Sequence, residues 1–300
     1  MNNGDLTHLI IAIEDGKGRI IDRQLYSDFL SGNRSIPILN YYTGRKLFDI
    51  LFDQLGIIKL EDNVLALNTI FNINPHKTVM SLLGKVAEAV IVRRCSEDED
   101  INRKWLSKAR RVNTKKETAA KFSAVGTGLK PTATKYPAIY NPTNPQRDII
   151  WVDEDRRRAL IGSSSSCAGM EAGLQIKVSH DGMKYIFKDL CRERYEIPLV
   201  YFDIGGDFYR VESELVSYFQ RINSTTRIIN GENFVDPRAV DRESFEEICY
   251  YEDLLTALVN GKLKIYDLLK NPAYAPTDSL KNAMVSEMVS SVPLDNRIIH

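Results

Sequence analysis

The chain has 300 residues, of which 43% are hydrophobic and 27% are charged, and its formal net charge is zero. This length allows one large domain or two small ones, and the composition is that of an ordinary globular protein. A neutral chain has no overall attraction to nucleic acid, so any basic surface has to be local. Four widely spaced cysteines without a CxxC pair argue against a structural zinc site and a disulfide scaffold.

No targeting or membrane segment is recognisable. Residues 1–5 lack the basic and apolar regions of a signal peptide, and no apolar run approaches the roughly 18 residues of a membrane span. We therefore expect a soluble, cytoplasmic protein that does not associate with a membrane.

Residues 1–74 are predicted to form an N-terminal extension. An apolar run at residues 9–13, turn residues at 15–18 and a possible second strand at 19–21 predict a β-hairpin. An amphipathic helix is predicted for residues 42–56, with Gly56 suited to its C-terminal end. Residues 63–74 are ambiguous between strand and helix.

Residues 75–206 are predicted to form the core of the protein, and residues 207–300 a helical C-terminal region that packs on it. Pro75 suits the first turn of a helix that Asn74 caps and that runs to about Arg94. Further elements are expected in the order strand, strand, helix and strand, at residues 148–152, 174–178, 183–193 and 197–202. Helical spacing recurs in residues 211–222, 244–258 and 262–269.

A stretch between residues 103 and 121 carries eight basic side chains and one acid, Glu117. It is either a solvated helix face or a contact for a phosphate backbone, since local cationic density binds nucleic acid without reading sequence. The basic residues are Arg103, Lys104, Lys108, Arg110, Arg111, Lys115, Lys116 and Lys121. A long loop with four prolines, residues 126–145, follows; loops of this length are usually functional or mobile.

Four polar residues of the core are chemically related. Gln175 and Lys177 alternate with apolar residues and share one face of a strand, while Asp148 opens another strand. Taken alone, Gln175 and Lys177 are typical of the solvent face of a sheet, and Asp148 is typical of a residue that caps a turn. Glu88 is harder to dismiss, because a carboxylate in the middle of an apolar helix needs a partner or an edge position. Gly84, one turn earlier, would permit a close backbone approach there.

Taken together, these four residues resemble the PD-(D/E)xK nuclease superfamily, in which a helix glutamate, a strand aspartate and an (E/Q)-x-K pair converge at one edge of a mixed sheet. The resemblance covers residues 75–205. A further strand of that fold, before the aspartate strand, is expected within residues 125–140. Two positions depart from the pattern. Arg147 precedes Asp148, with the proline displaced to Pro145, and Gln175 replaces the commoner acid, as in the Q-x-K form of Mrr-type restriction enzymes.

The resemblance implies a metal-dependent phosphodiester hydrolase. Glu88, Asp148 and the amide oxygen of Gln175 would hold Mg²⁺, for which Mn²⁺ can substitute; the lost carboxylate would weaken this binding. Lys177 would position or deprotonate the attacking water and neutralise charge in the transition state. The basic stretch would hold the nucleic acid backbone.

Other catalytic patterns are weaker. Ser163 to Cys167, with His180 and Asp181, has the ingredients of a nucleophile and base, but no Gly-x-Ser-x-Gly elbow is present. There is no phosphate-binding loop of the Gly-x-x-x-x-Gly-Lys-Ser/Thr type. Aromatic residues such as Tyr195 and Tyr201 are expected in the core.

The sequence thus predicts an α/β protein with a restriction-endonuclease-like core, a small mixed sheet flanked by helices. The expected function is that of a Mg²⁺-dependent endonuclease acting on DNA in restriction or anti-phage defence, although the residues do not distinguish DNA from RNA. The alternative is a catalytically inactive subunit of the same fold that binds nucleic acid or a protein partner. Substrate specificity, oligomeric state and the identity of a partner do not follow from these residues.

Overall fold

The computed structural model describes residues 10–14, 20–25, 44–61, 64–69, 71–162, 167–224 and 232–269. By packing, the chain divides into two compact units, residues 1–48 with 253–300, and residues 49–252. The boundaries predicted after residues 74 and 206 stay predictions. No helix in the described ranges is long and apolar enough to cross a membrane.

The first unit contains the predicted hairpin. β1 (Ile10–Glu14) and β2 (Ile20–Leu25) pair in antiparallel fashion, with Ile10 opposite Leu25; the turn between them lies outside the described residues. The predicted helix at residues 42–56 is confirmed for residues 44–54, and its last turn, Ile50–Gln54, is π-helical. Gly56 follows with a φ of 63°, a left-handed conformation that glycine adopts at little cost.

A small antiparallel sheet and a long helix lead into the core of the second unit. β3 (Ile58–Glu61) pairs with β4 (Val64–Leu67), which settles the start of the ambiguous segment as strand. α3 (Pro75–Glu97) begins as predicted: the Asn74 side chain accepts a hydrogen bond of 3.0 Å from the backbone N–H of His76. It ends three residues beyond the expected Arg94.

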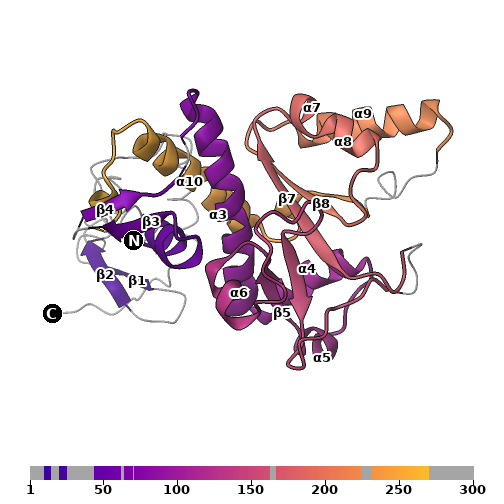
Figure 1. The fold of residues 1–300 in the computed structure, drawn as a ribbon, viewed down its shortest axis with the longest axis horizontal. Helices are drawn as coiled ribbons and strands as arrows, with labels where there is room; N and C mark the ends of the chain where they lie inside the picture. The colour runs from indigo at the N-terminus through magenta and orange to yellow at the C-terminus, as the bar shows by residue number, and fades with distance from the viewer. Residues whose placement is uncertain are drawn as a thin grey trace, which may run out of the picture. The chain divides into compact units, whose positions relative to one another are not determined.

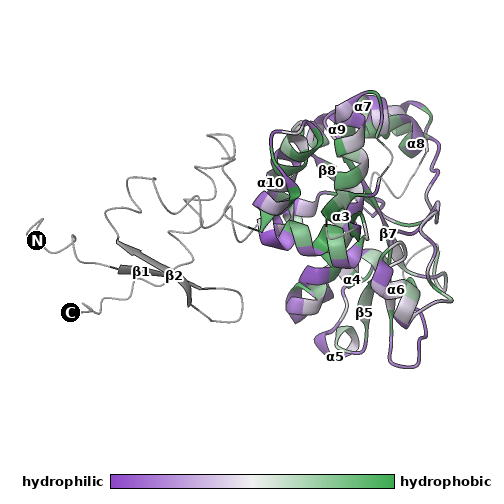
Figure 2. Cartoon of the chain, turned by 60° about the vertical axis from the view of Figure 1, so that its left-hand side comes forward, coloured by the Kyte–Doolittle hydropathy of each residue, from purple (hydrophilic) through white to green (hydrophobic). Residues whose placement is uncertain are grey.

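A five-stranded mixed sheet forms the centre of this unit (Figure 1). Its strands follow one another in space as they do in sequence: β5 (Ser123–Gly126), β6 (Ile149–Val152), β7 (Gly173–Ser179), β8 (Leu199–Asp203) and β9 (Phe234–Val235). Strands β5 to β7 are antiparallel, whereas β7, β8 and β9 are parallel. Their residues are mostly apolar, in contrast to the hydrophilic α5 (Figure 2).

Two expectations about strands need correction. The strand sought within residues 125–140 is β5, which begins two residues earlier; the remainder of that interval contains α6 and turns. The C-terminal region is not wholly helical, because Phe234 and Val235 form the edge strand β9. Two residues are too short a run for any periodicity in the sequence to indicate a strand.

The described ranges contain seven shorter α-helices: α4 (Glu99–Arg110), α5 (Lys116–Ala119), α6 (Lys130–Lys135), α7 (Gly182–Tyr185), α8 (Phe187–Cys191), α9 (Phe208–Arg221) and α10 (Arg242–Val259). The helix predicted for residues 183–193 is divided into α7 and α8 at the buried Ile186, whose φ of −118° departs from helical geometry. The helices predicted near residues 211–222 and 244–258 are confirmed as α9 and α10.

Helices α3, α4 and α10 pack against one face of the sheet. The fully buried Trp151 of β6 donates a hydrogen bond of 2.8 Å from its indole Nε1 to the side-chain oxygen of Asn102 on α4. Phe202 of β8, which the strand register places on the same face, stacks on Phe245 of α10 with ring centroids 6.2 Å apart. This face is therefore closed by aromatic packing.

The other face carries two separate apolar clusters. Leu199 and Tyr201 of β8 pack with residues of α7, α8 and α9. Ile150 and Val152 of β6 pack with Val125 and with the chain that follows α6. Between the two clusters runs β7, and the side chains that it directs to this face are those of Gln175, Lys177 and, at its end, Ser179.

Replacing Asn102 with Ala would leave the buried indole N–H of Trp151 without its acceptor. We expect Asn102→Ala to lower the free energy of unfolding by about 1–3 kcal/mol, the usual cost of such a group. Chemical denaturation measures this, with the exposed Lys104→Ala as a control that changes stability by less than about 0.5 kcal/mol. Equal stabilities of the two variants would contradict the role of Asn102.

Candidate active site

Asp148 is held in place through its backbone from both neighbouring strands. Its N–H donates to the Leu174 carbonyl at 2.9 Å, and its own carbonyl accepts from the Thr127 N–H at 2.8 Å. The preceding Arg147 donates to the carbonyl of Glu171 at 3.1 Å. Arg147 thus occupies the position of the displaced proline and ties the start of β6 to the chain that enters β7.

The carboxylate of Asp148 contacts the strand that carries Gln175. Its Oδ2 accepts hydrogen bonds from the Gln175 side-chain amide and, at 2.7 Å, from the backbone N–H of Ile176. Gln175 itself is 3% exposed, and its Oε1 is buried without a hydrogen-bond partner in the described part of the chain. A buried amide oxygen without a partner is costly, so such an atom in a native fold calls for an explanation, of which a bound water or ion is one.

Glu88 approaches the same place from the middle of α3. The flanking Ala87 and Ala89 are buried, and Glu88 forms no hydrogen bond or ion pair with the residues that the structure describes. A Cβ atom added at Gly128, in the turn after β5, would lie 3.7 Å from Glu88 Oε2. The expected close approach at Gly84 is wrong, since a Cβ there would meet no atom within 4 Å; the glycine beside the carboxylate is Gly128.

Lys177 lies two residues beyond Gln175 on the same face of β7. Its positive charge lowers the pKa of both Glu88 and Asp148, so the ammonium group acts electrostatically on both carboxylates. Among the described residues, however, no carboxylate lies within the 4 Å of a direct ion pair. The Lys177 Nζ lies 5.8 Å from the centroid of the Tyr195 ring.

Burial determines the ionisation of the two acids. It raises the pKa of Asp148 to about 6, although the Ile176 N–H, Lys177 and the Gln175 amide all lower it. Burial and the neighbouring Asp148 charge raise the pKa of Glu88 well above its ordinary value. Two carboxyl groups that resist ionisation side by side are typical of an acid pair built for a cation or a shared proton.

The donor set fits a hard divalent cation. Two carboxylates and an unpaired amide oxygen are the ligand types that Mg²⁺ prefers. No group of three His, Cys, Asp or Glu side chains that could hold a metal occurs in the described ranges. Glu88, Asp148 and Gln175 are therefore the residues that could hold a metal, with Lys177 beside them.

The arginines of the basic stretch are engaged within the protein. Arg103 pairs with Asp100 at 3.3 Å, and Arg110 donates to the Leu160 carbonyl at 3.1 Å. Arg111 donates to the Glu196 carbonyl at 2.6 Å and to the side chain of Asn233, and so ties the end of α4 to the chain on either side of β8. These guanidinium groups have structural partners already.

The lysines of the stretch differ from the arginines. All five are exposed, and Lys116 forms an ion pair of 3.7 Å with Glu99. Within the described residues the other four, Lys104, Lys108, Lys115 and Lys121, have no ion-pair partner. These four are the free cationic groups of the stretch.

The alternative nucleophile and base, Ser163 to Cys167 with His180 and Asp181, do not form a site among the described residues. Residues 163–166 lie outside the described ranges. His180 contacts Glu252 of α10, and Asp181 caps α7 by accepting from the Lys184 N–H at 3.1 Å. Both residues are thus used elsewhere.

Three groups beside the four predicted residues could not be assigned to the site from the sequence. Tyr195 is buried, as expected of a core residue, but it also contacts Lys177. Tyr185 of α7 is 55% exposed. The pKa of its hydroxyl is raised, mainly by partial burial and then by the negative charge of Asp148. The position of Gly128 follows from the turn after β5. No residue pattern marks these contacts, because each joins segments far apart in the sequence.

Comparison of the chain with protein-family models finds no matching family, and comparisons with curated proteins and with solved structures also find no match.

Glu88→Gln is expected to stabilise the metal-free protein at pH 8 and not at pH 5. The folded-state pKa of Glu88 is raised, so the wild-type carboxyl contributes most to stability below its unfolded-state pKa of about 4.3 and loses that contribution as the pH rises through the folded-state value. A neutral amide avoids the loss, and each kcal/mol gained raises Tm by about 2–4 °C.

Thermal unfolding with a chelator at several pH values measures this effect. Glu154→Gln, in an exposed turn, is the matched control and should leave Tm unchanged at every pH. A Tm difference for Glu88→Gln that does not change with pH would contradict the raised pKa of the Glu88 carboxyl group.

Proposed function

We propose that this chain is a Mg²⁺-dependent endonuclease with a PD-(D/E)xK-like core, and that DNA is its substrate. One observation carries the proposal. The Asp148 carboxylate contacts Gln175, whose amide oxygen is buried without a partner, while Glu88 and Lys177 interact electrostatically with the same carboxylate. These are the four residue types of the superfamily, in its order along the chain.

The topology supports the same proposal. α3 is followed by α4 and α5, by the antiparallel strands β5, β6 and β7 with α6 inserted between β5 and β6, by α7 and α8, and then by β8, which is parallel to β7. Apart from α4, α5 and α6, this order of helix, three strands, helix and strand resembles that of the superfamily. Asp148 stands at the start of the middle strand and Gln175 and Lys177 stand on the next, as that fold requires.

Each residue has a chemical task in this proposal. Glu88, Asp148 and Gln175 would hold the cation, and because the pKa values of the two acids are raised, a bound cation would favour their ionised forms. A bound Mg²⁺ supplies Lewis acidity, polarising a phosphate and acidifying water. Lys177 orients the attacking water or accepts its proton, and its charge offsets that of the transition state.

The exposed lysines would supply the contact with the phosphate backbone. Lys104 and Lys108 lie one turn apart on α4, and both are exposed, so they project from neighbouring positions on the helix surface. Lys115 follows α4, and Lys121 follows α5. Such contacts bind phosphates of any sequence. They do not distinguish DNA from RNA, so a cleavage assay on both substrates has to do so. The setting in restriction or anti-phage defence rests on the family resemblance alone.

A catalytically inactive subunit that binds nucleic acid or a protein partner is the second candidate. The observation in its favour is the Gln175 amide, which supplies a hydrogen bond to Asp148 where an acid would supply charge for a metal. With one carboxylate fewer, metal affinity falls. Metal binding and cleavage therefore decide between the two candidates.

Asp148→Ala is expected to abolish Mg²⁺-dependent cleavage of plasmid, linear and single-stranded substrates while the protein remains folded. Asp148 accepts a hydrogen bond from Gln175 and interacts electrostatically with Glu88, so its removal should eliminate the cation site. Asp155→Ala, which removes an exposed acid from the turn after β6, is the control and should cleave as the wild type does. Undiminished cleavage by folded Asp148→Ala would remove this residue from the site.

Gln175→Glu tests the metal site directly. A glutamate restores the usual carboxylate, so less Mg²⁺ should give half-maximal cleavage, whereas the rate at saturating metal need not rise. Lys177→Met keeps the apolar stem and removes the charge, and should abolish cleavage in either background. A metal titration of cleavage by the wild type, Gln175→Glu, Lys177→Met and the double variant measures both effects. Strong cleavage by Lys177→Met would overturn the mechanism, and the absence of cleavage and of calorimetric metal binding would establish the inactive subunit.

Changing Lys104, Lys108 and Lys115 together to Gln is expected to weaken DNA binding and its salt dependence. Each lost phosphate contact lowers the slope of log affinity against log salt by about 0.9 on duplex DNA. The control is Lys59→Gln, which removes an exposed lysine of β3. An unaltered slope for the triple variant would mean that these lysines form only a solvated surface.

A further inference from the structure

Tyr195 is a buried aromatic residue in a connection between two elements. It lies between α8 and β8 and is only 6% exposed, although its neighbours Arg194 and Glu196 are exposed. The Lys177 ammonium lies 5.8 Å from the centroid of its ring, a distance at which the ring attracts a cation electrostatically. One end of Lys177 is thus fixed in β7, and the other lies against this ring.

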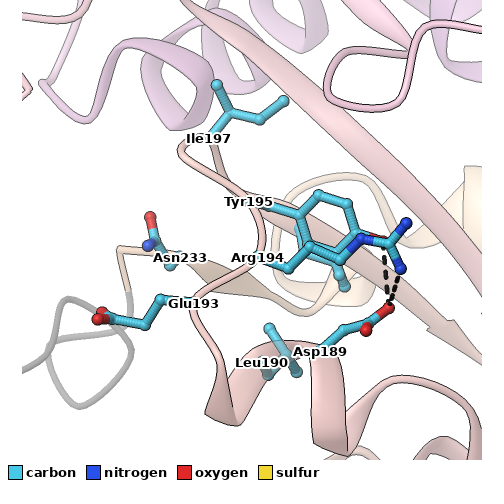
Figure 3. A pocket seen from close by; sticks show the side chains of 8 residues that line it. Asp189, Leu190, Glu193, Arg194, Tyr195, Ile197 and Asn233 are labelled. Carbon is cyan, nitrogen blue, oxygen red and sulfur yellow. Dashed lines mark hydrogen bonds and ion pairs between the residues drawn. The ribbon is translucent and has the colours of Figure 1, made fainter.

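The Tyr195 ring is held by polar contacts on its own connection. Its hydroxyl donates to Asp189 Oδ2 at 3.4 Å, and the Arg194 guanidinium donates to the same oxygen at 2.9 Å (Figure 3). The Arg194 guanidinium carbon also lies 5.5 Å from the ring centroid. These contacts restrict how the ring can turn.

The connection is in turn tied to the segment that enters β6. The Gln146 side-chain amide donates to the Arg194 carbonyl at 3.2 Å, and its oxygen accepts from the Glu196 N–H at 3.4 Å. Arg111 donates to the Glu196 carbonyl at 2.6 Å. Gln146 lies two residues before Asp148, so the backbone on both sides of Tyr195 is fixed to the chain that carries the catalytic aspartate.

We propose that Tyr195 is a positioning residue for Lys177: its ring holds the ammonium group beside Glu88 and Asp148 and prevents the flexible lysine stem from turning toward solvent. The inference rests on the proposed nuclease function for its catalytic consequence, but the contact itself exists without it. A lysine has four rotatable side-chain bonds, so a fixed ring at its tip selects one geometry among many.

Two variants separate the ring from the hydroxyl. Tyr195→Phe keeps the aromatic face and should cleave nearly as the wild type does. Tyr195→Leu removes the face, and kcat should fall about 3- to 30-fold, which corresponds to the range of cation–π attraction. KM should remain unchanged because Lys177 acts on the transition state and not on substrate binding. A purely structural role for Tyr195 would not give rescue by Phe together with a loss confined to kcat.

A second measurement does not depend on cleavage. In NMR spectra of the full chain with labelled lysine, the ring should shift the Lys177 ε-methylene signal, which Lys177→Met identifies. The shift should persist in Tyr195→Phe and disappear in Tyr195→Leu. If Tyr195→Leu does not fold, Asp189→Ala should reduce the shift instead, because it releases the Arg194 guanidinium that lies against the ring, a contact that Tyr195→Phe keeps.

The two measurements distinguish the failure of either idea. If no protein cleaves any substrate but the Lys177 signal responds to Tyr195 as described, the nuclease function fails and the positioning contact stands. The positioning role is overturned if the wild type cleaves and Tyr195→Leu has the wild-type kcat. It is also overturned if the ring-induced shift of the Lys177 signal persists in Tyr195→Leu.

Discussion

The antiparallel pairing of β6 with β7 is the constraint on which the candidate site depends. Ile149 lies opposite Leu174, and this register places Asp148 beside Gln175 on one face of the sheet. A slip of one residue would turn Asp148 to the other face, which is closed by Trp151 and Phe202. Aromatic packing on the closed face thus fixes the register that brings the polar side chains together on the other.

The candidate site lowers the stability of the fold, and this unfavourable contribution is typical of residues kept for a function. Two carboxyl groups with raised pKa values and an amide oxygen without a partner lie where apolar residues would pack more favourably. The surrounding structure compensates through the two apolar clusters and through the backbone contacts of Asp148. Local violations of packing rules that are held in place by a rigid frame are typical of functional sites.

The arginines and lysines of the basic stretch differ in their contacts, a difference that composition alone does not reveal. Arg110 and Arg111 bond to main-chain carbonyls, since a planar guanidinium group can satisfy several acceptors at once. Lysines such as Lys104 and Lys108 remain exposed and hydrated. The same run of positive charge therefore holds α4 to the core with its arginines and leaves its lysines available to a polyanion.

The sequence by itself determined the elements that rest on local signals: the Asn74–Pro75 helix start, the alternating strand around Gln175 and Lys177, and the helices α9 and α10. Capping, proline geometry and hydrophobic periodicity act over a few residues, so they are legible in a linear chain. The predicted association of Glu88, Asp148, Gln175 and Lys177 came from family resemblance. Only the tertiary structure decided the two-residue strand β9, the break at Ile186, Gly128 beside Glu88 and Tyr195 beside Lys177, because these depend on contacts between distant segments that no local pattern encodes.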